Sequence, residues 1–309
     1  MTPPTDAPLP SWPGITPAAS PKYPAVSVAA VTMVYNDPVY LKIWLEYYSR
    51  QLGAKNLYVV DHGSNDGSTD HLGAVNVIRL PRSPQDDPKR AAFLSSFCSS
   101  LLAYHDCVLH GDVDEILVAD PRVAATLPAY CAGVTAPVQT AIGLNVLHRL
   151  GHETPYTPER RVLAQRPWVF RSSSMCKPAL IRRPVRWSPG FHSADTPVYF
   201  GDLYLFHLRW FDLDTALRRL AKTRSMPWAH EDAGDHQRVS DAEMVEQFEG
   251  FGRLGLDTRD FDPPQRPLCD FLYLVTQSQH GRENEIYRIS LDIWPDSLWR
   301  VPERFRTLF

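Results

Sequence analysis

The sequence predicts an α/β fold in which a mostly parallel, Rossmann-like sheet is flanked by helices. Two observations support this class: apolar runs of strand length alternate with segments of helical periodicity, and polar clusters directly follow the strands. Right-handed crossovers place the ends of such strands on one side of the sheet, where ligands bind. The chain has 309 residues, of which 44% are hydrophobic, enough for one large core.

The first strand and the first helix are the most clearly marked elements. Residues 26–34 (VSVAAVTMV) form a β-branched run suited to a strand that is buried on both faces. Pro38 is typical of the first turn of a helix, and residues 39–52 place apolar side chains at helical spacing. Gly53 follows where a C-terminal capping glycine is expected.

The alternation of strands and helices continues along the chain. Further strands are expected at 57–60, 75–80, 107–110, 179–182 and 199–208, with a strand pair over 136–147. Helices are expected at 89–104, 212–223 and 240–254, and a long polar loop at 148–174.

The chain is expected to divide into three parts. Residues 1–24 contain eight of the 28 prolines and few large apolar residues, so we expect a disordered N-terminal segment. Residues 25–225 form the predicted domain, and residues 226–309 a helical extension packed on it.

Composition excludes several classes of protein. The formal net charge of −3 lacks the basic excess of a nucleic-acid binder. Five scattered cysteines without a CxxC pair favour reduced thiols in a cytosolic protein over disulfides or a zinc site. No apolar run approaches the roughly 20 residues of a membrane span, and the N-terminus lacks the pattern of a signal peptide. We therefore expect a cytoplasmic chain, either free or attached peripherally at the inner face of the membrane.

The sharpest candidate site is Asp112-Val113-Asp114, directly after the apolar strand at 107–110. In an extended strand the two carboxylates project to the same side and can converge on one hard divalent cation. The alternative is a solvated acidic turn, because so short a motif also occurs by chance. Its place at the end of a buried strand favours a functional site.

Two further polar clusters follow predicted strands. Asp61 ends a buried strand and opens the turn-rich loop 62–68 (HGSNDGS), where a carboxylate can accept hydrogen bonds from a nucleobase or ribose. Val34, Asn36 and Asp37 lie at the end of the first strand, on the same expected edge of the sheet. These four residues are therefore candidates for binding a nucleotide.

The quoted segments resemble a known family. VTMVYNDPVYLKIWLEYYSRQLGAKNLYVVDHGSNDGST followed by VLHGDVDEIL resembles the nucleotide-binding half of GT-A-fold glycosyltransferases of the family 2 type, nearest to the family 92-like branch. The resemblance covers residues 26–120 well and extends loosely to about residue 225. Departures include Asp37 where many relatives have Glu, Tyr48 in place of a frequent His, and His62 after the aspartate where Asp or Asn is usual.

The resemblance implies a metal-dependent, inverting glycosyltransferase with an acceptor-binding C-terminal part. It implies a UDP- or GDP-sugar donor, Mn²⁺ or Mg²⁺ as cofactor, and a hydroxyl acceptor on a glycan, glycolipid or polysaccharide precursor. The metal ligands would be Asp112 and Asp114, completed by a late histidine, either His207 or His192. Asp112 would also meet the nucleotide.

Two further residues are weaker candidates. Arg90 lies in the first turn of the helix that precedes the strand at 107–110, and it could bind diphosphate. A charged side chain that is simply exposed to water in that turn is as plausible. An inverting transfer needs a base near the acceptor hydroxyl. Glu153 in the polar loop GHET is the candidate, although no spacing singles it out.

Other classes of protein fit the sequence less well. An inactive nucleotide-binding module in a glycan assembly complex is the first alternative, opposed by the intact carboxylates of the motif. A nucleotidyltransferase should show a basic glycine-rich loop after the first strand, which VTMVYNDP lacks. A two-metal phosphoesterase would need more His and Asp ligands at the strand ends.

Overall fold

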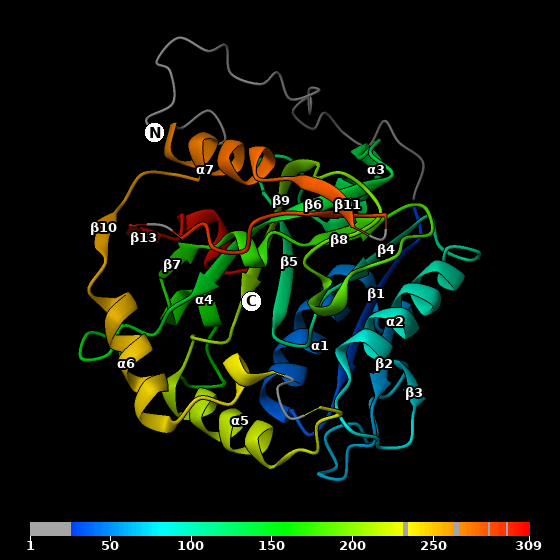
Figure 1. The fold of residues 1–309 in the computed structure, drawn as a ribbon, viewed down its shortest axis with the longest axis horizontal. Helices are drawn as coiled ribbons and strands as arrows, with labels where there is room; N and C mark the ends of the chain where they lie inside the picture. Colours follow the sequence, from blue (N-terminus) through cyan, green and yellow to red (C-terminus); the bar gives the residue numbers. More distant parts are fainter. Residues whose placement is uncertain (1–25, 231–233, 262–265, 284, 295) are drawn as a thin grey trace.

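The computed structural model describes residues 26–230, 234–261, 266–283, 285–294 and 296–309. These residues form an eleven-stranded mixed sheet with flanking helices and a separate two-stranded sheet (Figure 1). The predicted α/β class, with helices around a mostly parallel sheet, is confirmed. The proposed N-terminal segment 1–24 lies outside the described residues.

The sheet runs in the order β10-β13-β7-β6-β8-β4-β1-β2-β3, and β9 joins β5 to β6 off this path. The strands are β1 (Val28–Val34), β2 (Leu57–Asp61), β3 (Asn76–Arg79), β4 (Cys107–His110), β5 (Glu115–Ala119), β6 (Val138–Val146), β7 (Trp168–Arg171), β8 (Pro178–Ile181), β9 (Phe200–His207), β10 (Gly255–Asp257), β11 (His280–Glu283), β12 (Ile286–Arg288) and β13 (Ser297–Arg300). The helices are α1 (Pro38–Leu52), α2 (Asp87–Leu101), α3 (Leu127–Gly133), α4 (Val162–Gln165), α5 (Leu213–Ser225), α6 (Asp241–Gly252) and α7 (Arg266–Gln277).

The N-terminal half is a parallel four-stranded unit. Strands β3, β2, β1 and β4 are neighbours in that order, and all their pairings are parallel. Val34 pairs with Asp61, so β1 and β2 end level with each other. The sequence correctly predicts these strands and the helices α1 and α2 between them. The edge at which the sequence predicts polar clusters is therefore the carboxyl end of these four strands.

Helix α1 has the predicted boundaries and packing. Pro38 is its first residue, and Gly53 ends it with φ 80° and a hydrogen bond from its N–H to the Ser49 carbonyl at 2.9 Å. A left-handed φ costs glycine little because it has no Cβ. Trp44 and Tyr48 are buried in the main hydrophobic core, so α1 packs by its apolar face.

The second half differs from the prediction at two points. Residues 136–147 do not form a strand pair but contribute one strand, β6, which is buried throughout. Its partners are three different strands, so the sheet branches there. The predicted loop 148–174 contains strand β7, which pairs with β6 and β13 and in which Val169 and Phe170 are buried.

The C-terminal part belongs to the same sheet. Within residues 226–309, α6 and α7 are helices, and β10 and β13 add two strands to the main sheet. Figure 1 shows α7 along one margin of the molecule and α5 with α6 along the opposite one. All five cysteines lie within the described residues, where they are buried and form no disulfide. Among the described helices, none has the length and apolar character needed to cross a bilayer.

Candidate active site

Side-chain hydrogen bonds join the end of β1 to the loop after β2. The Val34 carbonyl accepts from the backbone N–H of His62 at 2.9 Å, and the Val34 side chain is buried. Asn36 has a left-handed φ of 47°. Its Nδ2 donates to Oδ1 of Asn65 at 2.7 Å, and its Oδ1 accepts from the Asn65 N–H at 2.9 Å. Val34 and Asn36 thus shape this edge, and their predicted contact with nucleotide stays a prediction.

Asp61 is buried inside its own loop. Its carboxylate accepts from the Ser64 N–H at 2.7 Å, from Oγ1 of Thr69 at 2.8 Å and from Nη1 of Arg79 at 2.6 Å. Burial raises the pKa of Asp61, but these hydrogen bonds and the Arg79 charge outweigh burial and hold the pKa below its ordinary value. The carboxylate therefore holds the loop together, and a contact with nucleobase or ribose is not shown.

The motif Asp112-Val113-Asp114 is a turn between β4 and β5. The N–H of Glu115 donates to the Asp112 carbonyl at 2.9 Å, which closes the turn. The expectation of an extended segment is wrong here. The two aspartates consequently enter two neighbouring sets of ion pairs instead of meeting side by side.

Asp112 is bound by cations from two elements. Arg90 of α2 forms a short ion pair with its Oδ1, and Nζ of Lys177 lies 3.4 Å from its Oδ2. Lys177 also donates to Glu115 at 2.5 Å. Burial raises the pKa of Asp112, but Arg90 and Lys177 hold it well below its usual range. Arg90 lies over the Phe191 ring at 5.0 Å, so one of its faces is shielded from water.

Asp114 is bound by a histidine and an arginine. Its Oδ2 lies 3.1 Å from Nε2 of His207 and also forms a short ion pair with Nη1 of Arg219. The other His207 nitrogen, Nδ1, lies 2.7 Å from Oδ1 of Asn145 on the adjacent strand β6. Burial raises the pKa of Asp114, but Arg219 and His207 hold it well below its usual range.

Asp37 connects the end of β1 to helix α5. Its side chain makes no capping hydrogen bond to α1. Instead its Oδ2 lies 3.2 Å from Nε of Arg219 and 2.9 Å from Nζ of Lys222. Lys222 also donates to the carbonyls of Tyr35 and Asn36, at 2.9 and 3.0 Å. We call these two neighbouring sets of ion pairs together the strand-end cluster. Its members are Asp37, Arg90, Asp112, Asp114, Glu115, Lys177, His207, Arg219 and Lys222.

Three cations of this cluster are not among the predicted site residues. One of them, Lys177, is buried. Arg219 and Lys222 were not considered, although their spacing of three residues places both on one side of α5. That spacing within a predicted helix was the available signal. It does not indicate which surface the helix faces.

The predicted metal ligands are only partly brought together. His207 meets Asp114, whereas Nδ1 of His192 lies 2.6 Å from the Ser174 carbonyl. Within the described ranges, no group of three or more His, Cys, Asp or Glu side chains is arranged to hold a metal ion. The pair Asp114–His207 is therefore the nearest approach to the predicted ligand set.

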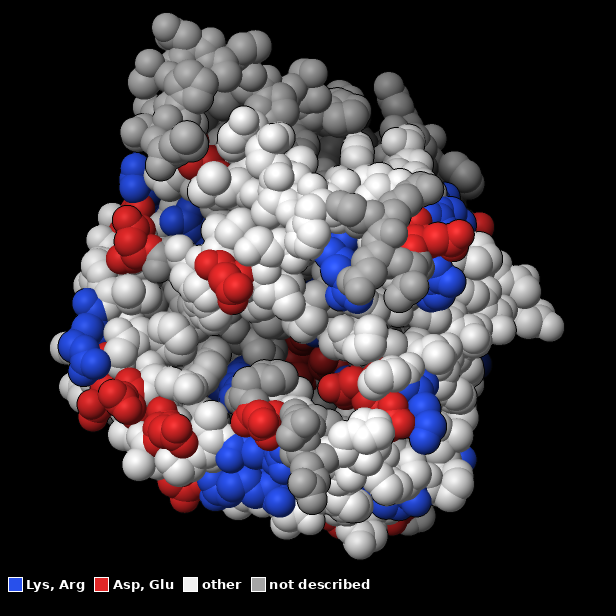
Figure 2. Space-filling model, in the orientation of Figure 1, with Lys and Arg blue, Asp and Glu red and all other residues white. Residues whose placement is uncertain are grey.

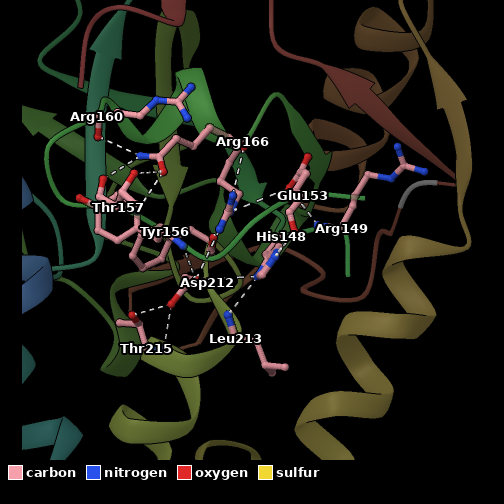
Figure 3. A network of polar contacts seen from close by, with 12 residues as sticks. His148, Arg149, Glu153, Tyr156, Thr157, Arg160, Arg166, Asp212, Leu213 and Thr215 are labelled. Carbon is pink, nitrogen blue, oxygen red and sulfur yellow. Dashed lines mark hydrogen bonds and ion pairs between the residues drawn. The ribbon is translucent and has the colours of Figure 1, made fainter. Parts of the chain in front are cut away.

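Glu153 belongs to a second polar network (Figure 3). Its Oε2 accepts from the N–H of Arg149 at 3.0 Å and lies 3.9 Å from Nε of Arg166. Arg166 also lies 3.4 Å from Oδ1 of Asp212, and Nε2 of His148 contacts the Glu153 carbonyl at 3.2 Å. Burial raises the pKa of Glu153 above its ordinary value. We call His148, Glu153, Arg166 and Asp212 the Arg166 network.

The face of the molecule drawn in Figure 2 carries charges of both signs. Figure 2 shows acidic and basic side chains in small groups over this face, with acidic side chains visible in a hollow near its middle. A surface cavity of about 380 Å³ between α1 and residues 156–162 includes none of the predicted site residues. The strand-end cluster is thus identified by its charges and contacts, not by a cavity.

Comparisons with known proteins find similarity among solved structures alone. No protein-family model matches the chain, and no curated protein matches it in sequence. One similar structure is glucosyl-3-phosphoglycerate synthase from Mycobacterium tuberculosis with Mn²⁺, UDP and product, at 17% identity and a TM-score of 0.28. That match covers 39% of this chain and 44% of the synthase, less than half of its length.

A second similar structure is a mannosyltransferase from Pyrobaculum calidifontis with GDP-mannose and Mn²⁺. It has 16% identity and a TM-score of 0.30, over 87% of this chain and 64% of that chain. A third is core-mannan synthase A from Aspergillus fumigatus in an Mn/GDP form, at 8% identity and a TM-score of 0.23, over 44% and 46% of the two chains. Since these TM-scores are all below 0.5, no function of this chain follows from them.

Proposed function

We propose that this protein is a metal-dependent, inverting glycosyltransferase of the GT-A type, in the family 2 and family 92-like group. The donor would be a UDP- or GDP-sugar, and the acceptor a hydroxyl of a glycan, glycolipid or polysaccharide precursor. One observation carries the proposal: the Asp112-Val113-Asp114 turn lies at the carboxyl end of a parallel strand, with a histidine imidazole against Asp114.

The pair Asp114–His207 fits a hard divalent cation. Its Oδ2 and Nε2 atoms are 3.1 Å apart, close to the roughly 3 Å that separates adjacent ligands of an octahedral ion. With Nδ1 of His207 donating to Asn145, a neutral ring would turn the lone pair of Nε2 toward a carboxylate. Such an arrangement suits a cation between the two groups, and a histidine held through its other nitrogen is typical of metal ligands.

A small number of protein ligands also suits this role. Mg²⁺-type ions in nucleotide sites are commonly held by one or two carboxylates, with substrate phosphates and water filling the other positions. The bound ion would offset negative charge on the departing nucleoside diphosphate as a Lewis acid. Asp114 and His207 would hold it, and either Mn²⁺ or Mg²⁺ is compatible with these donors.

The charges of the cluster define what else it can bind. Four carboxylates (Asp37, Asp112, Asp114 and Glu115) face four cations (Arg90, Lys177, Arg219 and Lys222), so the side chains are already balanced. A divalent cation alone would leave two uncompensated positive charges. A diphosphate arriving with the cation offsets them, so the two ligands should bind together.

The proposed diphosphate contact is Arg90. The proposed nucleotide-binding surface consists of Val34, Asn36, Asp37, Asp61 and Asp112. Arg90 and Asp112 are partly exposed, at 18% and 21% of their side chains, so a ligand can reach them. Glu153 stays the proposed base. Its raised pKa suits that role, whereas its packing against Arg166 suits a structural one.

The proposal is tested by measuring release of nucleoside diphosphate from UDP- and GDP-sugars with Mn²⁺, Mg²⁺ or EDTA. We expect metal-dependent release by the wild type, loss of release in Asp114→Asn, and full release in the matched control Asp292→Asn, an exposed aspartate outside the cluster. Metal-dependent nucleotide binding without any release would favour the inactive module. Release that continues in Asp114→Asn would overturn the metal site.

A further inference from the structure

Arg219 bridges two carboxylates from different strand ends. It extends from α5, with Nε 3.2 Å from Oδ2 of Asp37 and Nη1 paired with Oδ2 of Asp114. The guanidinium also lies over the Tyr40 ring, 4.7 Å from its centroid. About a quarter of the side chain (27%) is exposed, so Arg219 is held by its carboxylate partners while part of its side chain contacts solvent.

Arg219 contacts the Asp114 oxygen that a metal between Asp114 and His207 would bind. Oδ2 of Asp114 contacts both Nη1 of Arg219 and Nε2 of His207. A guanidinium and a divalent cation at one oxygen repel each other, because both are positive and the site is largely buried. Metal binding at Asp114 and His207 therefore requires Arg219 to withdraw from Asp114.

Lys222 cannot make the same exchange as readily. Its ammonium meets three oxygens within 3.0 Å, namely the carbonyls of Tyr35 and Asn36 and the Asp37 carboxylate. Those contacts use all three of its N–H donors. Lys222 thus holds α5 against the end of β1. Arg219 is the partly exposed cation that pairs with buried Asp114.

We propose that Arg219 is an exchange residue that couples the metal to the diphosphate. In the ligand-free protein its guanidinium takes the place of the divalent metal ion at Asp114. When a divalent cation and a nucleoside diphosphate bind, it leaves Asp114 and binds phosphate oxygens, for which the planar fork of arginine is suited. This inference rests on the proposed function and deepens it, because it assigns a phosphate-binding residue that is also the metal's competitor.

The proposal predicts opposite effects on two affinities. Removing the Arg219 charge removes a competitor for Asp114, so Mn²⁺ alone should bind more tightly. The same change removes a phosphate contact, so UDP or GDP at saturating Mn²⁺ should bind more weakly. A residue that only stabilised the fold would weaken both affinities or leave both unchanged.

The experiment measures Mn²⁺ affinity without nucleotide by electron paramagnetic resonance, and UDP and GDP affinity at saturating Mn²⁺ by calorimetry. For Arg219→Gln we expect about tenfold tighter Mn²⁺ and at least about tenfold weaker nucleotide. Arg219→Lys keeps a charge at Asp114 but lacks the fork, so its Mn²⁺ affinity should stay near wild type while nucleotide still binds more weakly. Arg218→Gln, the neighbouring arginine bonded to Thr215 within α5, is the matched control and should leave both affinities unchanged.

The outcomes separate this inference from the proposed function. If the folded wild type binds nucleotide only with Mn²⁺, and the two affinities of Arg219→Gln change in the same direction or not at all, the exchange role is wrong and the proposed function stands. If the wild type binds no nucleotide with any metal, the proposed function itself fails. Should Arg219→Gln not fold, the Arg219→Lys result decides, since unchanged nucleotide affinity there overturns the phosphate contact.

Discussion

The strand-end cluster and the Arg166 network are built from the same kinds of residues and differ in exposure. In the cluster, the side chains of Asp112 and Arg219 are 21% and 27% exposed. In the network, those of Arg166 and Asp212 are 1% and 5% exposed. Solvent reaches part of the first set of ion pairs, whose members Asp114 and Glu115 are only 4% and 2% exposed, and it reaches little of the second. Partly exposed charges beside buried ones thus distinguish the candidate binding site from the structural network.

The two regions are connected by helix α5. Asp212 caps the start of this helix, accepting from the N–H and the hydroxyl of Thr215 at 3.0 and 2.8 Å. Arg219 and Lys222 lie further along the helix, in the strand-end cluster. The buried network therefore fixes the position of the helix that carries two cations to the candidate site.

The largest predicted effect comes from removing the centre of the buried network. Arg166→Met leaves Asp212 and Glu153 without their buried cation, and breaking such a pair costs about 3 to 5 kcal/mol. Urea unfolding should show this loss of stability. Arg160→Gln is the control, because the Arg160 side chain is exposed and should matter little. A loss below about 1 kcal/mol in Arg166→Met would show that the network is not structural.

A smaller effect is expected in the acid dependence of stability. Burial raises the pKa of Asp212, but hydrogen bonds from Tyr156 and Thr215 and the Arg166 charge hold it below its ordinary value. An acid with a lowered pKa in the fold stabilises it above the ordinary pKa, near 3.9, and this contribution is lost as the pH falls further. Asp212→Asn keeps a capping side chain but removes the charge. Its stability should fall less steeply than that of the wild type below about pH 4, and equal slopes would contradict the assignment.

The smallest effect on stability is expected from Glu153→Gln, and its effect on transfer tests whether Glu153 is the proposed base. If Glu153 serves the Arg166 network alone, the variant should keep nucleotide affinity and change the rate of transfer by less than about threefold, whereas loss of a general base costs about 10²- to 10⁴-fold. Steady-state kinetics with a saturating donor provide the measurement. A loss of that size at unchanged nucleotide affinity would assign Glu153 to catalysis and break the comparison between the two regions.

Local sequence patterns predicted the first half of the fold. The β-branched run of β1, the helical spacing of α1 and the flanking Pro38 and Gly53 act within a few residues, so they can be interpreted without the tertiary structure. The motif Asp112-Val113-Asp114 was located for the same reason, because the apolar strand before it indicates its position. Its conformation was not predicted, since the turn depends on the pairing of β5 with β9.

Contacts between distant residues could not be predicted. Asp114 contacts Arg219, which is 105 residues away in the sequence, and Asp37 contacts Lys222, which is 185 residues away. The helical pattern of α5 placed these cations on one side of a helix but carried no information about the strand end they reach. Glu153 illustrates the same limit, because no spacing in the sequence indicates that its side chain lies beside buried Arg166.

The most direct test is a calorimetric titration of UDP and GDP into the wild type and Asp114→Asn, with Mn²⁺ or with EDTA. Because the cluster's charges are already balanced, the account predicts that nucleotide binds tightly only with metal. It also predicts that Asp114→Asn weakens this binding about 100-fold or more, the loss expected when one partner of a buried charged contact is removed. Tight binding in EDTA, or unchanged affinity in Asp114→Asn, would contradict the account and show that the protein's own cations hold the nucleotide without a metal at Asp114.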